Sequence, residues 1–300
     1  MTFDLSNNAL IPLVAGSIDL HGRSVAPKGN SKDLLDIARD ASEAGLAAIT
    51  FMDPHFSPTP LVETLKRHEC ADTKTRLLSG IELNICVGGL NVYAAEHELM
   101  IGGRIVSMPT TSAANYFRQI GRRSLDRQNA VRHPALEVLD PFGEPLDAVK
   151  EILDIIAAHD AVLATGFLHT SEIGPLLHAA SQRGVSRMLI THSGIDVGMS
   201  MSDMRDFAAL GAFVEHCPDA GIDCLGDYAP FEHSRAFISA ISIDRTILVP
   251  RQSRTDEDGI FGRMATTIRC GLDLGYSPEE IRQMVSTNAG RLLGLPTRDR

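Results

Sequence analysis

One pattern of hydrophobic and polar positions repeats along the chain: an amphipathic stretch, a glycine-containing turn and a short apolar run. In the first copy, Ser31 is a candidate N-cap, since serine is a preferred residue at that position of a helix. Gly45 fits the C′ position that favours a left-handed backbone, and the apolar run Ala47–Met52 follows at once. Between Ser31 and Gly45, apolar residues recur at helical spacing: Leu34, Leu35, Ile37, Ala38 and Ala41. This copy predicts a helix followed by a buried strand.

Eight apolar runs of this kind are predicted to be strands. Their hydrophobicity is continuous rather than alternating, as expected for a parallel sheet with both faces covered. Eight strands with helices between them predict a (β/α)8 TIM-type barrel. An open doubly wound sheet is the alternative, and the lack of a G-x-G-x-x-G motif after the first run counts against it. The runs are Leu13–Leu20, Ala47–Met52, Arg76–Leu83, Arg104–Met108, Ala161–Thr165, Arg187–Thr191, Ala212–Glu215 and Thr246–Val249.

The chain of 300 residues shows no linker or compositional break. A barrel of this length is ordinary as one unit, so residues 1–300 are predicted to form a single domain. The widest gap between predicted strands spans residues 110–145 and contains the turn signal Asp140-Pro141-Phe142-Gly143. We expect an elaborated loop there, with a lid as one interpretation.

Composition narrows the function classes. The net charge of −10 argues against a surface for nucleic acid or an anionic membrane. The five cysteines are odd in number and form no C-x-x-C motif, which favours reduced thiols in the cytoplasm. The N-terminus lacks the basic region of a signal peptide, and no apolar run reaches membrane-spanning length. We therefore expect a cytoplasmic protein, and barrels of this kind often form homo-oligomers.

Polar residues end most of the predicted strands, where barrel chemistry collects. Imidazoles and carboxylates at one barrel mouth suit a zinc-like site, and they suit metal-free acid–base chemistry equally well. Because Glu215 and His216 are adjacent on a strand, they should point to opposite faces, and at most one is expected in the mouth. The polar strand-end residues are His21, Asp53, His55, Glu82, Asn84, His169, His192, Glu215 and His216.

Two arginines, Arg251 and Arg254, follow the eighth predicted strand. Guanidinium groups bind carboxylate or phosphate through two parallel hydrogen bonds, so these residues could hold an anionic substrate. A solvated loop, or salt bridges to the acidic residues 256–258, explains them equally well.

Three segments resemble the metal-dependent amidohydrolase superfamily over nearly the full chain. Asp19-Leu20-His21 is similar to the family's His-x-His opening, and Thr191-His192 matches its sixth-strand histidine. The segment 286–295, STNAGRLLGL, is similar to its C-terminal helix signature. The resemblance implies an amidohydrolase-like barrel, hydrolytic activity and a divalent metal, in a degenerate branch of the superfamily.

Departures from the family pattern limit what the resemblance implies. Arg23 stands where the second histidine is expected, and Ser107 where the fourth strand would offer a bridging lysine. Phe167 replaces the fifth-strand histidine, with His169 two residues on, and Arg251 stands where the catalytic aspartate is expected. These changes argue against a two-metal centre. They leave one ion, most simply zinc, or no metal at all, and Arg23 and Arg251 would add positive charge for an anionic substrate.

The leading hypothesis is a hydrolase acting on an amide, lactone or related C–N or C–O bond of a small, carboxylated molecule. A metal-independent lyase, decarboxylase or cyclase on the same barrel is one alternative, and an inactive barrel used for binding or assembly is another. The candidate catalytic residues are His192, Glu215, Glu82 and Asp53; the candidate substrate-binding residues are Arg23, Arg251, His55 and Asn84; the candidate metal ligands are His21, His169, His192 and His216.

Overall fold

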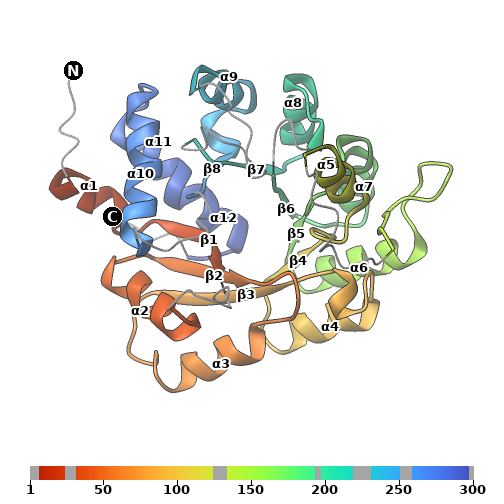
Figure 1. Cartoon of the computed structure of the whole chain (residues 1–300), viewed down its shortest axis with the longest axis horizontal. Helices are drawn as coiled ribbons and strands as arrows, with labels where there is room; N and C mark the ends of the chain where they lie inside the picture. The colour runs from red at the N-terminus through yellow and green to blue at the C-terminus, as the bar shows by residue number, and fades with distance from the viewer. Residues whose placement is uncertain are drawn as a thin grey trace. The chain divides into compact units, whose positions relative to one another are not determined.

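The computed structural model describes residues 7–23, 32–123, 134–192, 197–218, 231–250 and 259–296. Strands and helices alternate along these residues (Figure 1). The strands are β1 (Ile18–Arg23), β2 (Ala48–Met52), β3 (Arg76–Glu82), β4 (Ile105–Ser107), β5 (Val162–Ala164), β6 (Arg187–Ile190), β7 (Phe213–His216) and β8 (Thr246–Leu248). The helices include α1 (Asn7–Val14), α2 (Leu34–Glu43), α3 (Thr59–Arg67), α4 (Val92–Met100), α5 (Ala114–Arg123), α6 (Asp147–Ala158), α7 (Thr170–Gln182), α8 (Met201–Ala209), α9 (Phe231–Ile241), α10 (Gly259–Asp273), α11 (Pro278–Arg282) and α12 (Asn288–Leu293).

The strands follow one another in the sheet in chain order, from β1 to β8. Their registers are parallel; Ile18 of β1 pairs with Ala48 of β2, for example, and Leu163 of β5 with Met188 of β6. Parallel neighbours in sequence order, each joined through a helix, are the topology of a (β/α)8 barrel. The predicted fold class is confirmed.

Backbone contacts divide the chain into two compact units. The first unit comprises Met1–Met52, Pro58–Ser79 and Glu215–Arg300, and the second comprises Asp53–Ser57 and Gly80–Val214. In the first unit, apolar residues of strands β2 and β8 pack with helices α1, α2 and α10. That core includes Leu10, Val14, Ile37, Ile49, Phe51, Leu248, Met264 and Ile268.

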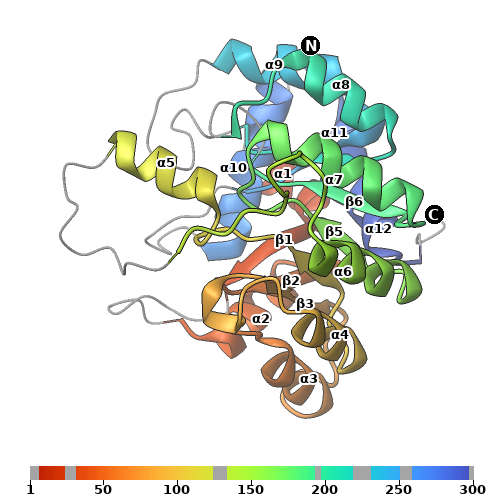
Figure 2. The same cartoon turned by 90° about the vertical axis from the view of Figure 1, so that its right-hand side faces the viewer.

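The second unit has its own buried residues. Its helices pack in succession, α4 on α6, α6 on α7 and α7 on α8 (Figure 2). The α6 face that is buried carries Val149, Ile152, Leu153 and Ile156, at the spacing of one helical stripe. Strands β4 and β5 are buried along their whole length. This burial holds the ends of β3 to β6 in fixed positions for the residues described below.

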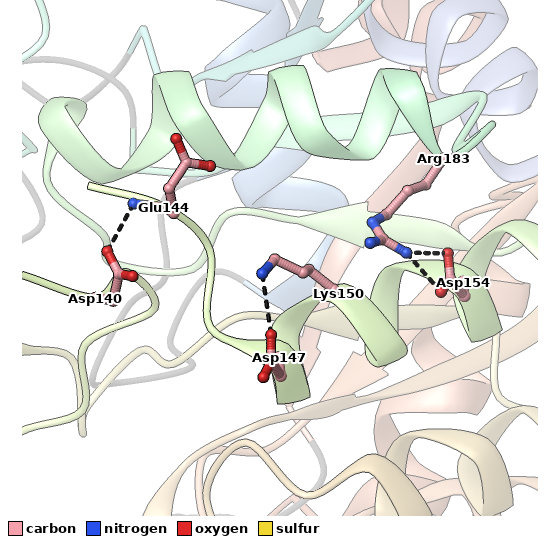
Figure 3. Close-up of polar contacts among 6 residues, drawn as sticks. All are labelled: Asp140, Glu144, Asp147, Lys150, Asp154 and Arg183. Carbon is pink, nitrogen blue, oxygen red and sulfur yellow. Dashed lines mark hydrogen bonds and ion pairs between the residues drawn. The ribbon is translucent and has the colours of Figure 1, made fainter. Parts of the chain in front are cut away.

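The predicted gap at residues 110–145 contains α5 and a tight turn. The turn is closed by the carboxylate of Asp140, which accepts hydrogen bonds from the backbone N–H groups of Phe142 and Glu144 at 2.8 and 2.9 Å. Exposed ion pairs follow on α6, where Lys150 contacts Asp147 at 3.0 Å and Arg183 of α7 contacts Asp154 at 2.6 Å (Figure 3). Exposed pairs of this kind contribute little to stability.

Two predicted boundaries are wrong. The first strand begins at Ile18 rather than Leu13, because residues 7–14 form α1 and bury Leu10 and Val14. The N-cap of α2 is Asp33 rather than Ser31; its carboxylate accepts from the backbone N–H of Asp36 in a capping box. The left-handed backbone predicted at Gly45 is confirmed by a φ of +74°. No helix in the described part of the chain is long and apolar enough to cross a membrane.

Candidate active site

The end of β1 is shaped by Asp19, a buried carboxylate in the first unit. Its Oδ1 accepts a hydrogen bond from the backbone N–H of His21 at 2.9 Å. The register between β1 and β2 shifts between Asp19 and Gly22. A Cβ at Gly22 would lie 2.8 Å from the Ile49 side chain, so only glycine fits there without displacement. The register shift and the Asp19 hydrogen bond together fix the backbone position of His21 at the end of β1.

His21 is paired with Glu215 of β7, in the same unit. Its Nε2 lies 2.9 Å from Glu215 Oε2, and the side chains are 17% and 6% exposed. A mostly buried carboxylate beside an imidazole orients the ring and favours one tautomer. The pair is the type of group that moves protons in acid–base catalysis.

The neighbouring residue, His216, points elsewhere. Its ring stacks on Phe237 of α9, with centroids 4.7 Å apart and planes inclined by 22°. The expected opposite orientation of Glu215 and His216 is therefore confirmed, and Glu215 is the one beside His21. His216 remains a predicted ligand whose ring here has an aromatic packing partner.

In the second unit, a hydrogen-bond network joins the end of β3 to the loop after β4. Asn84 is fully buried, and its Oδ1 accepts from the backbone N–H groups of Thr110 and Ser112 at 2.9 and 3.0 Å. Its Nδ2 donates to Pro54 O at 3.1 Å, Thr110 Oγ1 at 2.8 Å and Glu82 Oε2 at 3.3 Å. The Thr110 hydroxyl in turn donates to Glu82 Oε2. Asn84 therefore fixes the carboxylate of Glu82 in position.

The end of β2 repeats the arrangement seen at β1. Asp53 Oδ1 accepts from the backbone N–H of His55 at 2.8 Å, as Asp19 does for His21. Both are Asp-x-His sequences, in which the aspartate holds the backbone of the following histidine. The His55 ring lies beside Cys86, with 3.7 Å between Nδ1 and Sγ.

His192 and His169 lie in different local environments of the second unit. His192 follows β6, and its ring centroid is 4.9 Å from that of Phe167, which in turn meets Tyr116 edge-on at 5.4 Å. Burial raises the pKa of the Tyr116 hydroxyl. His169 is the N-cap of α7: its Nδ1 lies 2.9 Å from Ser171 Oγ and accepts from the Ser171 backbone N–H. The His169 side chain thus caps the N-terminus of α7.

Some candidates cannot be placed. Arg251 lies outside the described residues, and only the backbone of Arg23 is described, as the last residue of β1. Sequence reasoning in turn missed Thr110, Ser112 and Tyr116. Thr110 and Ser112 come directly after the fourth strand, and hydroxyl residues at a strand end were the available signal.

The fold family implies a metal, and the residues do not fit its two-metal arrangement. At the end of β4, Ser107 donates its hydroxyl to Met108 O, and at the fifth-strand position Phe167 is buried and apolar. No three His, Cys, Asp or Glu side chains of the described residues are arranged to hold an ion. The described residues therefore do not fit a two-metal centre.

Solved structures define the class of this fold. An amidohydrolase from Pseudomonas aeruginosa matches with a TM-score of 0.63 at 12% identity, over 95% of this chain and 97% of that chain. A lactonase from Listeria monocytogenes matches with 0.56 at 12% identity, over 95% and 97%. A phosphotriesterase homology protein from Escherichia coli matches with 0.55 at 13% identity, over 93% and 99%. The chain has the amidohydrolase-type barrel fold, as its sequence motifs indicated.

The family itself is also defined. The chain belongs to the family of unknown function DUF6282, whose model matches residues 16–215. No curated protein matches the chain. The matched segment ends at Glu215 and includes His21, so both members of the pair described above lie within the family's own region.

Proposed function

We propose that the protein is a hydrolase that cleaves an amide, lactone or related C–N or C–O bond of a small molecule, with His21 and Glu215 as its proton-transfer pair. The observation that carries the proposal is the 2.9 Å contact between the two side chains at the ends of β1 and β7. Barrel enzymes place their catalytic residues at the C-terminal ends of the strands. The fold shared with an amidohydrolase and a lactonase supports the choice of reaction.

The pair has a simple chemical role. When ionised Glu215 accepts a hydrogen bond from Nε2 of His21, the neutral ring carries its lone pair on Nδ1. That nitrogen would take a proton from the attacking water, and the carboxylate would stabilise the imidazolium that forms. The proton would then pass to the leaving group. General acid–base catalysis of this kind contributes about 10²- to 10⁴-fold in rate.

The proposed substrate is anionic. Support comes from the sequence, where Arg23 is two residues beyond His21 and Arg251 follows β8. A guanidinium near the site would hold a carboxylate through paired hydrogen bonds. Glu82, Asp53 and His192 of the second unit stay candidate catalytic residues on the sequence pattern alone. The Glu82 carboxylate is held there by Asn84 and Thr110.

A one-ion version of the enzyme is the second candidate. One observation favours it: Asp19 is 1% exposed, and its Oδ2 has no hydrogen-bond partner in the described part of the chain. A buried carboxylate oxygen is costly unless it is paired, and a cation would satisfy it. Asp19 would contribute one ligand to such an ion, although no set of three His, Cys, Asp or Glu side chains in the described ranges is arranged around it. When bound, a divalent ion such as zinc supplies Lewis-acid activation of water or carbonyl.

The test is a hydrolysis panel of lactones, amides and esters, each with and without a carboxylate, using the full chain. We expect turnover of at least one carboxylated member, and a fall in kcat of about 10²-fold or more in Glu215→Gln and in His21→Asn. His68→Gln, an exposed histidine after α3, is the matched control and should behave as wild type. Turnover that survives in both pair variants would overturn the assignment.

The same panel separates the two versions. Activity that survives exhaustive chelation supports the metal-free pair. Activity that is lost on chelation and restored by zinc supports the one-ion site.

A further inference from the structure

Cys86 and His55 form a second pair of reactive side chains in the second unit, apart from the function proposed above. Cys86 belongs to the single helical turn Ile85–Val87 that follows β3, and His55 belongs to the turn that follows β2. The Cys86 Sγ lies 3.7 Å from His55 Nδ1, a hydrogen-bonding distance for sulfur. Both side chains belong to exposed residues, so reagents in solution can reach them.

The environment of Cys86 differs from those of the other described cysteines. Cys70 is buried, and burial raises the pKa of its thiol, which makes it a poorer nucleophile. Cys217 and Cys270 are half-buried. Of the cysteines in the described ranges, Cys86 is the one that is exposed, and it also contacts an imidazole. Exposure together with a neighbouring base is the setting of a reactive thiol.

The backbone holds the two partners in this arrangement. Asp53 Oδ1 accepts from the His55 N–H at 2.8 Å, and Asn84 Nδ2 donates to Pro54 O at 3.1 Å. The turn bearing Cys86 is closed by a hydrogen bond from Val87 N to Asn84 O at 3.0 Å. Gly88, with φ of +97°, ends that turn in a conformation that glycine adopts without strain. Backbone hydrogen bonds therefore hold both the segment that carries His55 and the turn that carries Cys86.

We propose that Cys86 is a site of reversible covalent modification, in which its thiol, assisted by His55, exchanges with small-molecule disulfides. The thiol proton passes to Nδ1 of His55, and the thiolate attacks one sulfur of the disulfide. The S–S bond of the disulfide breaks, a mixed disulfide forms at Cys86, and the departing thiolate takes up the proton. The net exchange converts one thiol and one disulfide into another thiol and another disulfide, so it needs no further oxidant.

The experiment follows thiol release from 5,5′-dithiobis(2-nitrobenzoate) by the native full chain, with peptide masses to locate the adduct. We expect the fastest phase to modify Cys86 and to disappear in Cys86→Ser. In His55→Gln and His55→Asn the rate at pH 7 should fall about tenfold or more, and its pH dependence should change. The matched control is His97→Gln, an exposed histidine on α4 without a cysteine partner among the described contacts, which should react as wild type.

Two results would overturn the proposal. One is a fastest phase that maps to another cysteine or survives in Cys86→Ser. The other is a pair of His55 variants that react at the wild-type rate, with thermal unfolding showing that they are folded. Because labelling is measured without any substrate, the outcome is independent of whether the hydrolase proposal holds.

Discussion

His192 adopts a φ of +52°, in the left-handed region that residues other than glycine rarely enter. It follows β6, and its ring packs against that of Phe167. The preceding residue is held firmly, since Thr191 N donates to Thr165 Oγ1 at 3.1 Å and Thr191 Oγ1 donates to Gly166 O at 2.7 Å. A strained residue that its neighbours hold in place is a sign of function, so His192 stays a candidate catalytic residue.

The backbone at His192 leads to a prediction at the residue scale. His192→Val should destabilise the fold by about 1 kcal/mol or more relative to His192→Asn, because asparagine tolerates a left-handed backbone and a β-branched residue does not. Urea unfolding of the two variants measures the difference. Both lack the imidazole, so its loss cancels in the comparison. Equal stabilities would show that the backbone does not constrain this position.

Individual side chains could be predicted from the sequence only in part. The alternation of a strand correctly separates Glu215 from His216, because neighbouring side chains point to opposite faces. That rule does not say which residue faces His21. The sequence also predicts His169 as a metal ligand without indicating that it caps α7, because a cap depends on local backbone geometry that sequence spacing does not reveal.

At the scale of elements, the network around Asn84 joins two strand-end loops. Each polar atom of this buried amide has partners, and two of them are backbone N–H groups of the loop after β4. The network holds both the Glu82 carboxylate and the loop that carries Pro54. Asn84, predicted as a substrate-binding residue, therefore also positions its neighbours.

This network makes a quantitative prediction. Asn84→Ala should lower the free energy of unfolding by about 2 to 4 kcal/mol, because the buried N–H groups of Thr110 and Ser112 lose their acceptor. Asn91→Ala, which removes only the N-cap of α4, is the matched control and should cost about 1 kcal/mol. Denaturant unfolding monitored by circular dichroism compares them. A smaller loss in Asn84→Ala than in Asn91→Ala would contradict the role assigned to the network.

Helices and strands could be predicted from the sequence where the apolar residues showed one clear pattern, either helical spacing or a short continuous run. The sequence pattern located all eight strands, and seven of them to within one or two residues at each end. The exception is β1, since residues 7–14 are apolar without clear periodicity, and such a run does not distinguish a strand from a buried helix. Tertiary packing of Leu10 and Val14 decides in favour of the helix.

At the scale of the whole molecule, the fold follows from the repeated helix–turn–strand pattern. The C-terminal signature is explained by packing in the first unit: Asn288 Nδ2 donates to Ile243 O and Thr246 O, both at 2.7 Å, and Ser286 Oγ donates to Gly16 O at 2.6 Å. These contacts specify the barrel and say nothing about the reaction. The proposed reaction rests on a few strand-end residues, and their contacts follow from the tertiary structure rather than from the sequence pattern.

The central claim is that His21 and Glu215 act as one catalytic unit. The most direct test is a double-mutant cycle on kcat/KM with the best substrate of the panel, using His21→Asn, Glu215→Gln and the double variant. We predict that each single variant loses about 10²-fold or more and that the double variant loses little beyond the worse of the two, as for residues that act together. Losses that multiply independently, or a wild-type rate in either single variant, would contradict the account.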